Sequence, residues 1–362
     1  MDDEQRTAWL RLSRVERVGP VTFRELINHY GTAAAALDAL PDIASRASRR
    51  SLRIPERSAI EAEVERLHRF GGRLICSGEP HYPRALEAYD AAPMVIQVVG
   101  RPEAWTRPTV GVVGSRRASM ASAKFTMQIA EELSRSGYAI ASGFARGIDT
   151  AAHRASTSHG TIAVFAGGID HVYPPENEPL AHEIVDGGGA IVSEMPFGWK
   201  PRAKDFPRRN RIIAGMSLGV IVVEAALRSG SLITARLANE MGREVFAVPG
   251  SPLDPRSEGA NSLLKQGANL CLSATDVFEH LAGAVAEPEP RLEAPPSAPV
   301  VPIEPNEGDR ARLIGALDRT PVDLDELVRF TGLEPRAVQY ILLELDLAGR
   351  IVRHPGNRVS LS

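Results

Sequence analysis

The chain has 362 residues, of which 43% are hydrophobic and 24% charged, and its formal net charge is -3. This length exceeds what one ordinary hydrophobic core serves, so we expect two or three domains of a soluble globular protein. The lack of a long apolar run and of a basic N-terminus argues against a membrane partner and a signal peptide. Cys76 and Cys271 have no His or Cys at metal-binding spacing, so we expect no disulfide framework, no metal and a cytoplasmic location.

Residues 1–72 are predicted to form an N-terminal helical module. Apolar residues recur at helical spacing in three stretches, around Trp9, over 23–30 and over 60–70. The turn Arg17-Val18-Gly19-Pro20 leads into the second stretch, and Gly31 closes it as a C-terminal cap would. A glycine turn between two short helices is typical of a SAM-like or helix-hairpin-helix-like unit, which can hold a phosphate on backbone N–H groups. The alternative, which the pattern favours, is a helical module that only packs.

Residues 73–282 are predicted to form an α/β domain with a mostly parallel sheet, because short β-rich apolar runs alternate there with helical stretches. The expected strands are 110–113, 138–142, 161–165, 190–193, 218–223 and 244–248. The expected helices are 121–133, 150–158, 179–185 and 232–241. Ligands of such sheets bind at the carboxyl ends of the strands, where the informative residues of this chain fall.

A proline-rich linker is predicted over 283–306, because seven prolines and no aromatic residue lie between Ala284 and Pro305. Residues 307–362 then show three amphipathic helices and a terminal hairpin, the layout of a winged helix. The helix expected over 335–347 is the one that would enter a DNA groove. Its neighbourhood carries Glu334, Glu344 and Asp346, which is a poor charge pattern for duplex DNA, so a protein contact is an equally good interpretation.

The segment from Lys200 to Arg211 is strongly basic, with six Lys or Arg residues against Asp205 alone. The three arginines and one asparagine of Phe206-Pro207-Arg208-Arg209-Asn210-Arg211 precede what we interpret as an apolar turn and the strand at 218–223. Such local charge in a slightly acidic chain indicates an anionic ligand, and a polyanion explains it better than a small acid does. The alternative is a solvated loop.

Glycine and serine loops follow several of the expected strands. Gly114-Ser115-Arg116-Arg117 reads as a phosphate site or, alternatively, a tight structural turn, because the third glycine and the ribose carboxylate of a dinucleotide fingerprint are missing. No cofactor is therefore expected. Similar loops carry Gly143 with Arg146, then Gly168, and then Arg228-Ser229-Gly230 at the start of a helix.

Two further pairs of polar residues leave alternatives open. Asp149 and His153 are four residues apart and could form a metal pair or supply a general base, but without a third ligand a structural hydrogen bond is favoured. Glu224 could be a catalytic carboxylate or could pair with an arginine of the basic segment. Asn210 could bind a ligand or cap a helix.

Taken in order, these motifs resemble those of the DNA-processing protein A (DprA, also called Smf) family. The resemblance covers roughly residues 80 to 275 and runs through Tyr82-Pro83-Arg84-Ala85-Leu86, Gly114-Ser115-Arg116, Ser142-Gly143-Phe144-Ala145-Arg146-Gly147-Ile148-Asp149, Gly168-Ile169-Asp170, Tyr173-Pro174, Ser193-Glu194, Phe206-Pro207-Arg208-Arg209-Asn210-Arg211, Val223-Glu224-Ala225, Ser229-Gly230-Ser231 and Val248-Pro249-Gly250.

This resemblance implies an extended Rossmann-like domain that binds single-stranded DNA, protects it during natural transformation and loads the RecA recombinase onto it. It also implies a homodimer formed through that domain, and no catalysis. The DNA contacts that it implies are Ser115, Arg116, Arg117, Gly168, Lys204, Phe206, Arg209, Asn210, Arg211 and Arg228. Phe206 would stack on a base. From the neighbouring loops we add Gly143, Arg146, Ser229 and Gly230.

The rival interpretation is a Rossmann-like enzyme that hydrolyses nucleoside monophosphates. Such enzymes place a Gly/Thr loop near a glutamate, and Glu224 with Ser229-Gly230-Ser231 is faintly similar. The paired acid and base that glycosidic cleavage needs cannot be assembled from this sequence. We therefore expect a binding protein.

Overall fold

The computed structural model describes residues 1–47, 52–284, 305–354 and 356–362. The chain divides into two compact units, one made of the described residues of Met1–Glu61 and Arg291–Ser362, the other of those of Ala62–Pro290. The linker predicted over 283–306 lies almost entirely outside the described residues. Within the described ranges, no helix has the length and apolar character needed to cross a membrane.

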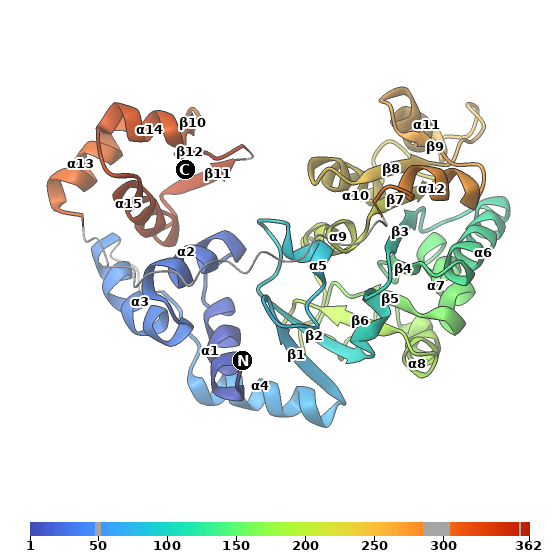
Figure 1. Ribbon diagram of the computed structural model, residues 1–362, viewed down its shortest axis with the longest axis horizontal. Coiled ribbons are helices and arrows are strands. Elements are labelled where there is room, and N and C mark those ends of the chain that lie inside the picture. Colours follow the sequence, from blue (N-terminus) through green and yellow to red (C-terminus); the bar gives the residue numbers. More distant parts are fainter. Residues whose placement is uncertain (48–51, 285–304, 355) are drawn as a thin grey trace. The chain divides into compact units, whose positions relative to one another are not determined.

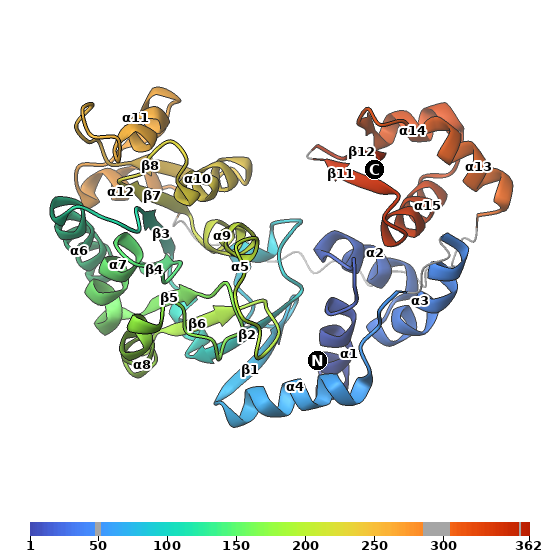
Figure 2. The ribbon, with the colours of Figure 1, turned by 180° about the vertical axis from the view of Figure 1, so that it is seen from behind.

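The larger unit is built on a nine-stranded sheet with the order β1-β2-β6-β5-β4-β3-β7-β8-β9 (Figures 1 and 2). Its strands are β1 Gly72–Cys76, β2 Val95–Gly100, β3 Thr109–Gly114, β4 Ala139–Ser142, β5 Thr161–Val164, β6 Ala190–Ser193, β7 Gly219–Val223, β8 Glu244–Ala247 and β9 Asn269–Leu270. Strands β3 to β9 pair in parallel, whereas β1 and β2 add an antiparallel hairpin beside β6. The mostly parallel sheet is confirmed, and the hairpin was not predicted.

The sheet of the larger unit has a topological switch point between β3 and β7. From β3 the chain proceeds through β4, β5 and β6 in one direction, and then returns to place β7, β8 and β9 on the other side of β3. The crossovers that follow β3 and β7 therefore leave the sheet in opposite directions. A crevice between such strand ends is the usual ligand site of an open parallel sheet.

Both faces of this sheet are buried, which explains the continuous apolar runs of its strands. Alternate residues of β7 point to opposite faces: Val220 and Val222 pack with α9 Asp205–Met216 and α10 Gly230–Glu240. Ile221 and Val223 pack on the other face with helices α6 Met120–Arg135, α7 Ile148–Ser156 and α12 Ala274–Leu281. The remaining helices of this unit are α5 Arg84–Glu87, α8 Glu178–Asp186 and α11 Glu258–Lys265, with 3-10 turns at Pro102–Trp105, Thr157–His159 and Pro175–Asn177.

The basic segment forms part of a helix, which corrects its interpretation as arginines before an apolar turn or as a solvated loop. Helix α9 runs from Asp205 to Met216, and its second half is buried in the core through Ile212 and Ile213. Gly215 lets the helix approach α5, because a Cβ there would come within 2.6 Å of Leu86 Cδ1. Burial on several faces, rather than an amphipathic pattern, is what hid this helix in the sequence.

The smaller unit contains the helices α1 Asp3–Ser13, α2 Pro20–Tyr30 and α3 Ala33–Ala47, and α4 Arg57–Arg69 begins in it. Asp2 caps α1 through the backbone N–H of Gln5, and Pro20 opens α2 where its missing N–H costs nothing. Its C-terminal part has α13 Glu307–Ala316, α14 Leu324–Thr331 and α15 Pro335–Leu347 with a β10-β12-β11 sheet, formed by β10 Val322–Asp323, β11 Ile351–His354 and β12 Arg358–Leu361. The helical module and the winged helix are both confirmed.

Candidate nucleic-acid interface

A groove of about 870 Å³ opens at the switch point, at the carboxyl ends of β3 and β7. Its walls come from the loop after β3, the first turns of α9 and the start of α10. The predicted site residues that line it are Ser115, Arg116, Arg117, Phe206, Arg209, Asn210, Arg228, Ser229 and Gly230. Segments far apart in the sequence therefore meet at one edge of the sheet, as the rule for parallel sheets predicts.

The loop after β3 is held tightly at its base. A Cβ on Gly114 would lie 1.9 Å from the carbonyl oxygen of Val223, so only glycine lets these strand ends come together. Ser115 Oγ accepts a hydrogen bond from the N–H of Arg117 at 3.1 Å. Arg116 and Arg117 are both exposed. The loop thus presents two guanidiniums to solvent from a fixed backbone.

Two aromatic rings stand next to this loop. The Cζ of Arg116 lies 5.0 Å from the centre of the Phe206 ring, and the ring of Tyr173 lies 5.7 Å from that of Phe206 at 60°. Tyr173 is 50% exposed, and Phe206 is partly exposed. From sequence, Tyr173 was noted only as part of a motif, because 33 positions separate it from Phe206. Together the three side chains form a small cationic and aromatic surface.

The start of α10 forms the opposite wall. Ser229 caps the helix by accepting from the N–H of Ser231, and Asn210 donates from Nδ2 to the carbonyl oxygen of Gly230 at 3.1 Å. Asn210 thus joins α9 to α10. Gly230 has no atom within 4 Å of a hypothetical Cβ, and Arg228 is exposed. An open helix N-terminus beside an exposed guanidinium favours an anion.

Arg209 lies beneath the groove rather than on its rim. It is 6% exposed, and its Nη1 donates to the carbonyl oxygen of Val164 at 2.6 Å. Burial lowers the pKa of Arg209 to about 10, and Asp149 opposes this shift. At neutral pH the side chain is still a cation, and its position makes it part of the packed floor.

Asp149 and His153 take structural roles, as their spacing without a third ligand favoured. Asp149 Oδ2 accepts from the N–H of Ala145 at 3.2 Å, and burial raises the pKa of this carboxyl while Arg209 opposes the rise. His153 Nδ1 lies 2.8 Å from Thr161 Oγ1, and burial, reinforced by Arg209, lowers the pKa of His153 to about 3. Among the described residues, no cluster of three or more His, Cys, Asp or Glu side chains is suited to a metal ion.

Two arginines of the basic segment, Arg208 and Arg211, are bound to one carboxylate within the fold. Glu194, at the end of β6, accepts hydrogen bonds from Arg208 at 2.9 and 3.1 Å and from Arg211 at 2.5 Å. Arg211 also donates to the carbonyl oxygen of Ala91 and is only 8% exposed. The charge that faces the groove therefore comes mainly from other segments of the chain.

Five predicted site residues lie outside the lining of the groove: Gly143, Arg146, Gly168, Lys204 and Arg211. The Arg209 guanidinium fills the space over Gly143. Arg146 is exposed and forms an ion pair with Glu176. Gly168 is buried against Pro196 and Trp199, and Lys204 is exposed at the N-cap position of α9.

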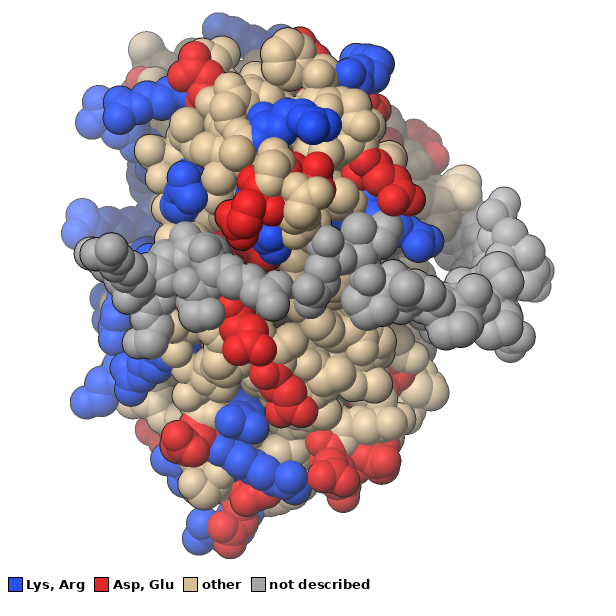
Figure 3. Space-filling model, turned by 90° about the vertical axis from the view of Figure 1, so that its left-hand side faces the viewer, with Lys and Arg blue, Asp and Glu red and all other residues tan. Residues whose placement is uncertain are grey.

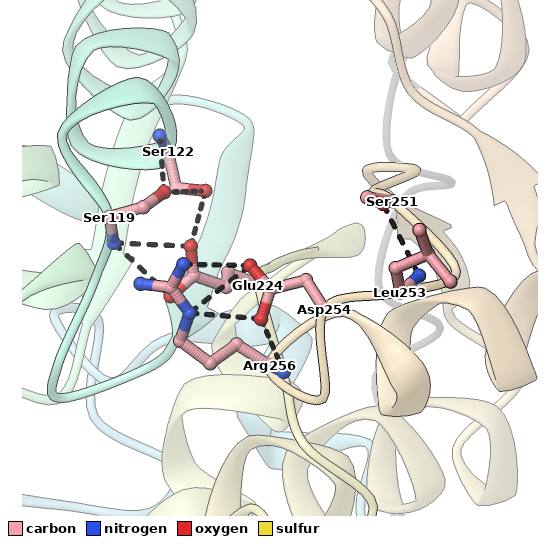
Figure 4. A network of polar contacts seen from close by, with 7 residues as sticks. All are labelled: Ser119, Ser122, Glu224, Ser251, Leu253, Asp254 and Arg256. Atoms are coloured by element: carbon pink, nitrogen blue, oxygen red, sulfur yellow. Dashed lines mark hydrogen bonds and ion pairs between the residues drawn. The ribbon is translucent and has the colours of Figure 1, made fainter.

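Glu224 holds the start of α6 (Figure 4). This residue has a φ of 53°, is 5% exposed, and accepts from the N–H of Ser119 at 3.1 and 3.2 Å and from Ser122 Oγ at 2.7 Å. Among the described residues, Glu224 forms no ion pair with an arginine of the basic segment, which was one of the two roles considered for it. Beside it lies Arg256, a lining residue that sequence reasoning missed. Asp254 holds Arg256 through paired hydrogen bonds and, with Glu224, raises the pKa of its guanidinium.

Comparison with known proteins gives consistent matches along the chain. Residues 73–282 match the DNA recombination-mediator protein A family, residues 3–65 the DprA-like N-terminal HHH domain, and residues 293–357 the DprA winged helix domain. Protein Smf of Escherichia coli (strain K12) is 37% identical over 98% of this chain and 95% of its own. The DNA processing protein DprA of Bacillus subtilis is 47% identical over 48% of this chain and 58% of its own.

Two solved structures are similar to this one. The crystal structure of DprA from Streptococcus pneumoniae superimposes with a TM-score of 0.64 at 35% identity, over 75% of this chain and 95% of its own. The structure of DprA from Helicobacter pylori superimposes with a TM-score of 0.54 at 29% identity, over 59% of this chain and 96% of its own. The latter structure concerns the single-stranded DNA binding mode of the Helicobacter pylori protein.

Proposed function

The chain belongs to the DNA recombination-mediator protein A (DprA/Smf) family, and from this premise we propose that it acts by gripping single-stranded DNA in the groove at the switch point. The observation that carries the proposal is the surface formed by Arg116, Phe206 and Tyr173. This surface combines a guanidinium that can bind a phosphate with two aromatic rings on which an unstacked base can stack. Only single strands offer both at once, because duplex bases are already stacked on each other.

The phosphates would be held along both walls of the groove. Ser115, Arg116 and Arg117 supply one wall, and Arg228 with the N-terminus of α10 supplies the other. Arg256 adds a further guanidinium at the rim. None of these arginines is buried, so each can exchange water for a phosphate oxygen at low cost.

The buried members of the predicted site would act by shaping the groove. Arg209 is packed over Gly143, Asn210 links α9 to α10, and Arg211 is bound to Glu194. Lys204 is exposed at the start of α9, where it would extend the backbone path beyond Phe206. We keep Arg146 and Gly168 as candidate contacts outside the groove.

We propose that the protein works as a homodimer through the larger unit and delivers DNA to the RecA recombinase. The edge strand β9 supports the first part, because it ends the sheet and two leucines beside its open edge, Leu270 and Leu272, are 48% and 59% exposed. An open edge with apolar side chains favours association with another chain. The match to the recombination-mediator family supports the second part, transfer to RecA.

We propose a non-catalytic role for the groove. Glu224, the carboxylate that a hydrolase would need, is nearly buried and accepts hydrogen bonds on both oxygens from the start of α6. A free acid–base pair is the minimum for glycosidic cleavage. Incubation of the native protein with nucleoside monophosphates should release no free base. Base release by the native protein that is lost in Glu224→Gln would contradict this proposal.

The decisive experiment is a binding titration that compares a labelled single strand with the matching duplex at several salt concentrations. We expect the single strand to bind more tightly. Its affinity should fall with salt at a log–log slope of about -0.7 for each phosphate contacted. Equal affinity for the single strand and the duplex, or an affinity that does not depend on salt, would contradict the proposed binding mode.

A further inference from the structure

Helix α15 of the winged helix is buried on two opposite faces. One face belongs to the core of its own module, through Val338, Ile341, Leu342 and Leu345. The other carries a second buried row of residues that lies outside that core: Ala337, Tyr340, Leu343 and Leu347, which are 6%, 4%, 1% and 1% exposed. A helix that reads a duplex must leave one face open to the groove. In α15 that face is covered.

The N-terminal helical module of the same unit covers this face of α15, because α2 and α3 pack against it. The ring of His29, on α2, lies 4.4 Å from that of Tyr340, and the hydroxyls of Tyr30 and Tyr340 are 3.3 Å apart. These aromatic contacts fill the centre of the covered face. They leave the Tyr340 side chain only 4% exposed.

Polar contacts surround the aromatic centre. Arg353, on β11, donates to Glu25 at 2.7 Å and to Asp346 at 3.0 Å, and Thr22 donates to the same Asp346 at 3.0 Å. The side chains of Glu25, Asp346 and Arg353 are all between 21% and 24% exposed. Burial raises the pKa of Glu25, and Arg353 opposes this rise. A cation bound by two half-buried carboxylates fixes the register of the two modules.

The glycine turn that precedes α2 also lies at this contact. Arg17 Nη1 donates to the carbonyl oxygen of Leu347, the last residue of α15, at 3.2 Å. A Cβ on Gly349 would come within 2.6 Å of the same guanidinium nitrogen. The turn at 17–20 was one candidate for holding a phosphate, and α15 was the other candidate for reading DNA. The turn therefore contacts the winged helix, and α15 contacts the N-terminal helical module.

We propose that the N-terminal helical module is the resident partner of the winged helix and that α2 occupies the face of α15 with which such a helix would contact DNA. The two ends of the chain form one docked body, and the winged helix serves in it as a protein-binding module. The charges support this assignment, because Arg310 and Arg353, which contact α15, are both bound by carboxylates. Acidic and basic side chains lie beside one another over the middle of the face seen in Figure 3. Duplex recognition needs a concentration of positive charge.

The proposal is tested by reversing one interface charge in the full chain. Glu25→Arg places a second cation against Arg353, so we expect hydrogen exchange to accelerate severalfold in both α2 and α15. Asp38→Arg is the matched control, because Asp38 is exposed on α3 of the same module, and its exchange should match that of the native chain. Unchanged protection of α15 in Glu25→Arg would overturn the proposal.

A second measurement keeps the test independent of folding defects in that variant. Glu25→Cys with Arg353→Cys replaces two side chains that form an ion pair across the contact and are 22% and 24% exposed, so both cysteines can react. Treated with a short bismaleimide, this variant should give a link within one chain, whereas each single substitution should not. The native Cys76 and Cys271 are buried and should stay unreacted. No link, or a link only between two chains, would show that α15 does not hold the α2 of its own chain.

Discussion

The guanidinium of Arg209 occupies the place of a side chain on Gly143: a Cβ there would come within 2.1 Å of Nη1. The two residues belong to α9 and to the loop after β4, so their contact fixes the floor of the groove. It also explains why a residue from a basic segment is 6% exposed. Charge reversal at Arg209 would remove a packed part of the core, so it is not a clean test of DNA binding.

Gly143→Ala should therefore reduce stability and weaken binding together. The added methyl must displace a buried guanidinium, and overpacking of this kind costs about 1–3 kcal/mol of unfolding free energy. Denaturant unfolding monitored by circular dichroism measures the effect. Gly230→Ala is the control, because its Cβ would meet open space. Equal stability of the two variants would contradict the role given to Arg209.

Arg116→Glu combined with Arg228→Glu should abolish tight binding of single strands while the fold stays intact. Both side chains are exposed on opposite walls of the groove, so their replacement costs little folding energy. The salt slope should become shallower by about 0.7 for each phosphate lost. Arg236→Glu, on the exposed side of α10, should bind as the native chain does. Weak binding by that control as well would point to a general charge effect.

Tyr173→Ala and Phe206→Ala should each weaken binding without changing the salt slope. Stacking on a base is worth about 1–3 kcal/mol, which corresponds to roughly 5- to 150-fold in Kd. Fluorescence anisotropy with a short labelled oligonucleotide measures the loss. Tyr173→Phe retains the ring and should restore most of the affinity. A loss in Tyr173→Phe as large as in Tyr173→Ala would assign the effect to the hydroxyl.

His153 should make stability depend on pH in the acidic range. Its pKa is about 3 in the folded chain and about 6.5 when unfolded, so between these values the unfolded state binds the extra proton. Stability should therefore fall as the pH drops from 6.5 towards 3, by about 1 kcal/mol per pH unit. His153→Phe removes this contribution. The difference between the two unfolding curves isolates it, because Asp149, which acts with the opposite sign, is present in both.

Leu272→Glu should shift the chain from dimer to monomer. The side chain is 59% exposed beside the edge strand β9, so the change disturbs no core contact of one chain but places a charge in the proposed interface. Sedimentation velocity reports the change in mass. Leu253→Glu is a control, since Leu253 is 93% exposed and lies elsewhere. A native chain that is already monomeric would reject the interface.

Six of the seven parallel strands could be predicted from sequence, because the central ones are buried on both faces and so read as uninterrupted apolar runs. The short edge strand β9, in which neither residue is buried, was not predicted. β6 was predicted with its observed limits, Ala190–Ser193. The hairpin of β1 and β2 was missed, since its strands lie before the regular alternation begins. Helix α9 was missed for a different reason: nine of its twelve residues are buried, including Arg209 and Arg211, so no polar face marks its period.

Within the site, sequence could indicate the loops but not the partners of the charges. Nothing in the local pattern shows that Glu194 would bind both Arg208 and Arg211, because that contact depends on where β6 ends in the folded sheet. Tyr173 and Arg256 were missed for the same reason, since their proximity to Phe206 and Glu224 is purely tertiary. A scan of the sequence for aromatic residues that follow the glycine loops would have found Tyr173, five positions after Gly168.

The two-sided burial of α15 affects how the chain can be divided. If the C-terminal module were produced alone, Tyr340, Leu343 and Leu347 would face water along one side of a helix. Such a row of apolar side chains promotes self-association. An assembly seen with that fragment would then report on a surface that the whole protein keeps covered. Activities assigned to the winged helix are therefore best measured in chains that retain residues 1–61.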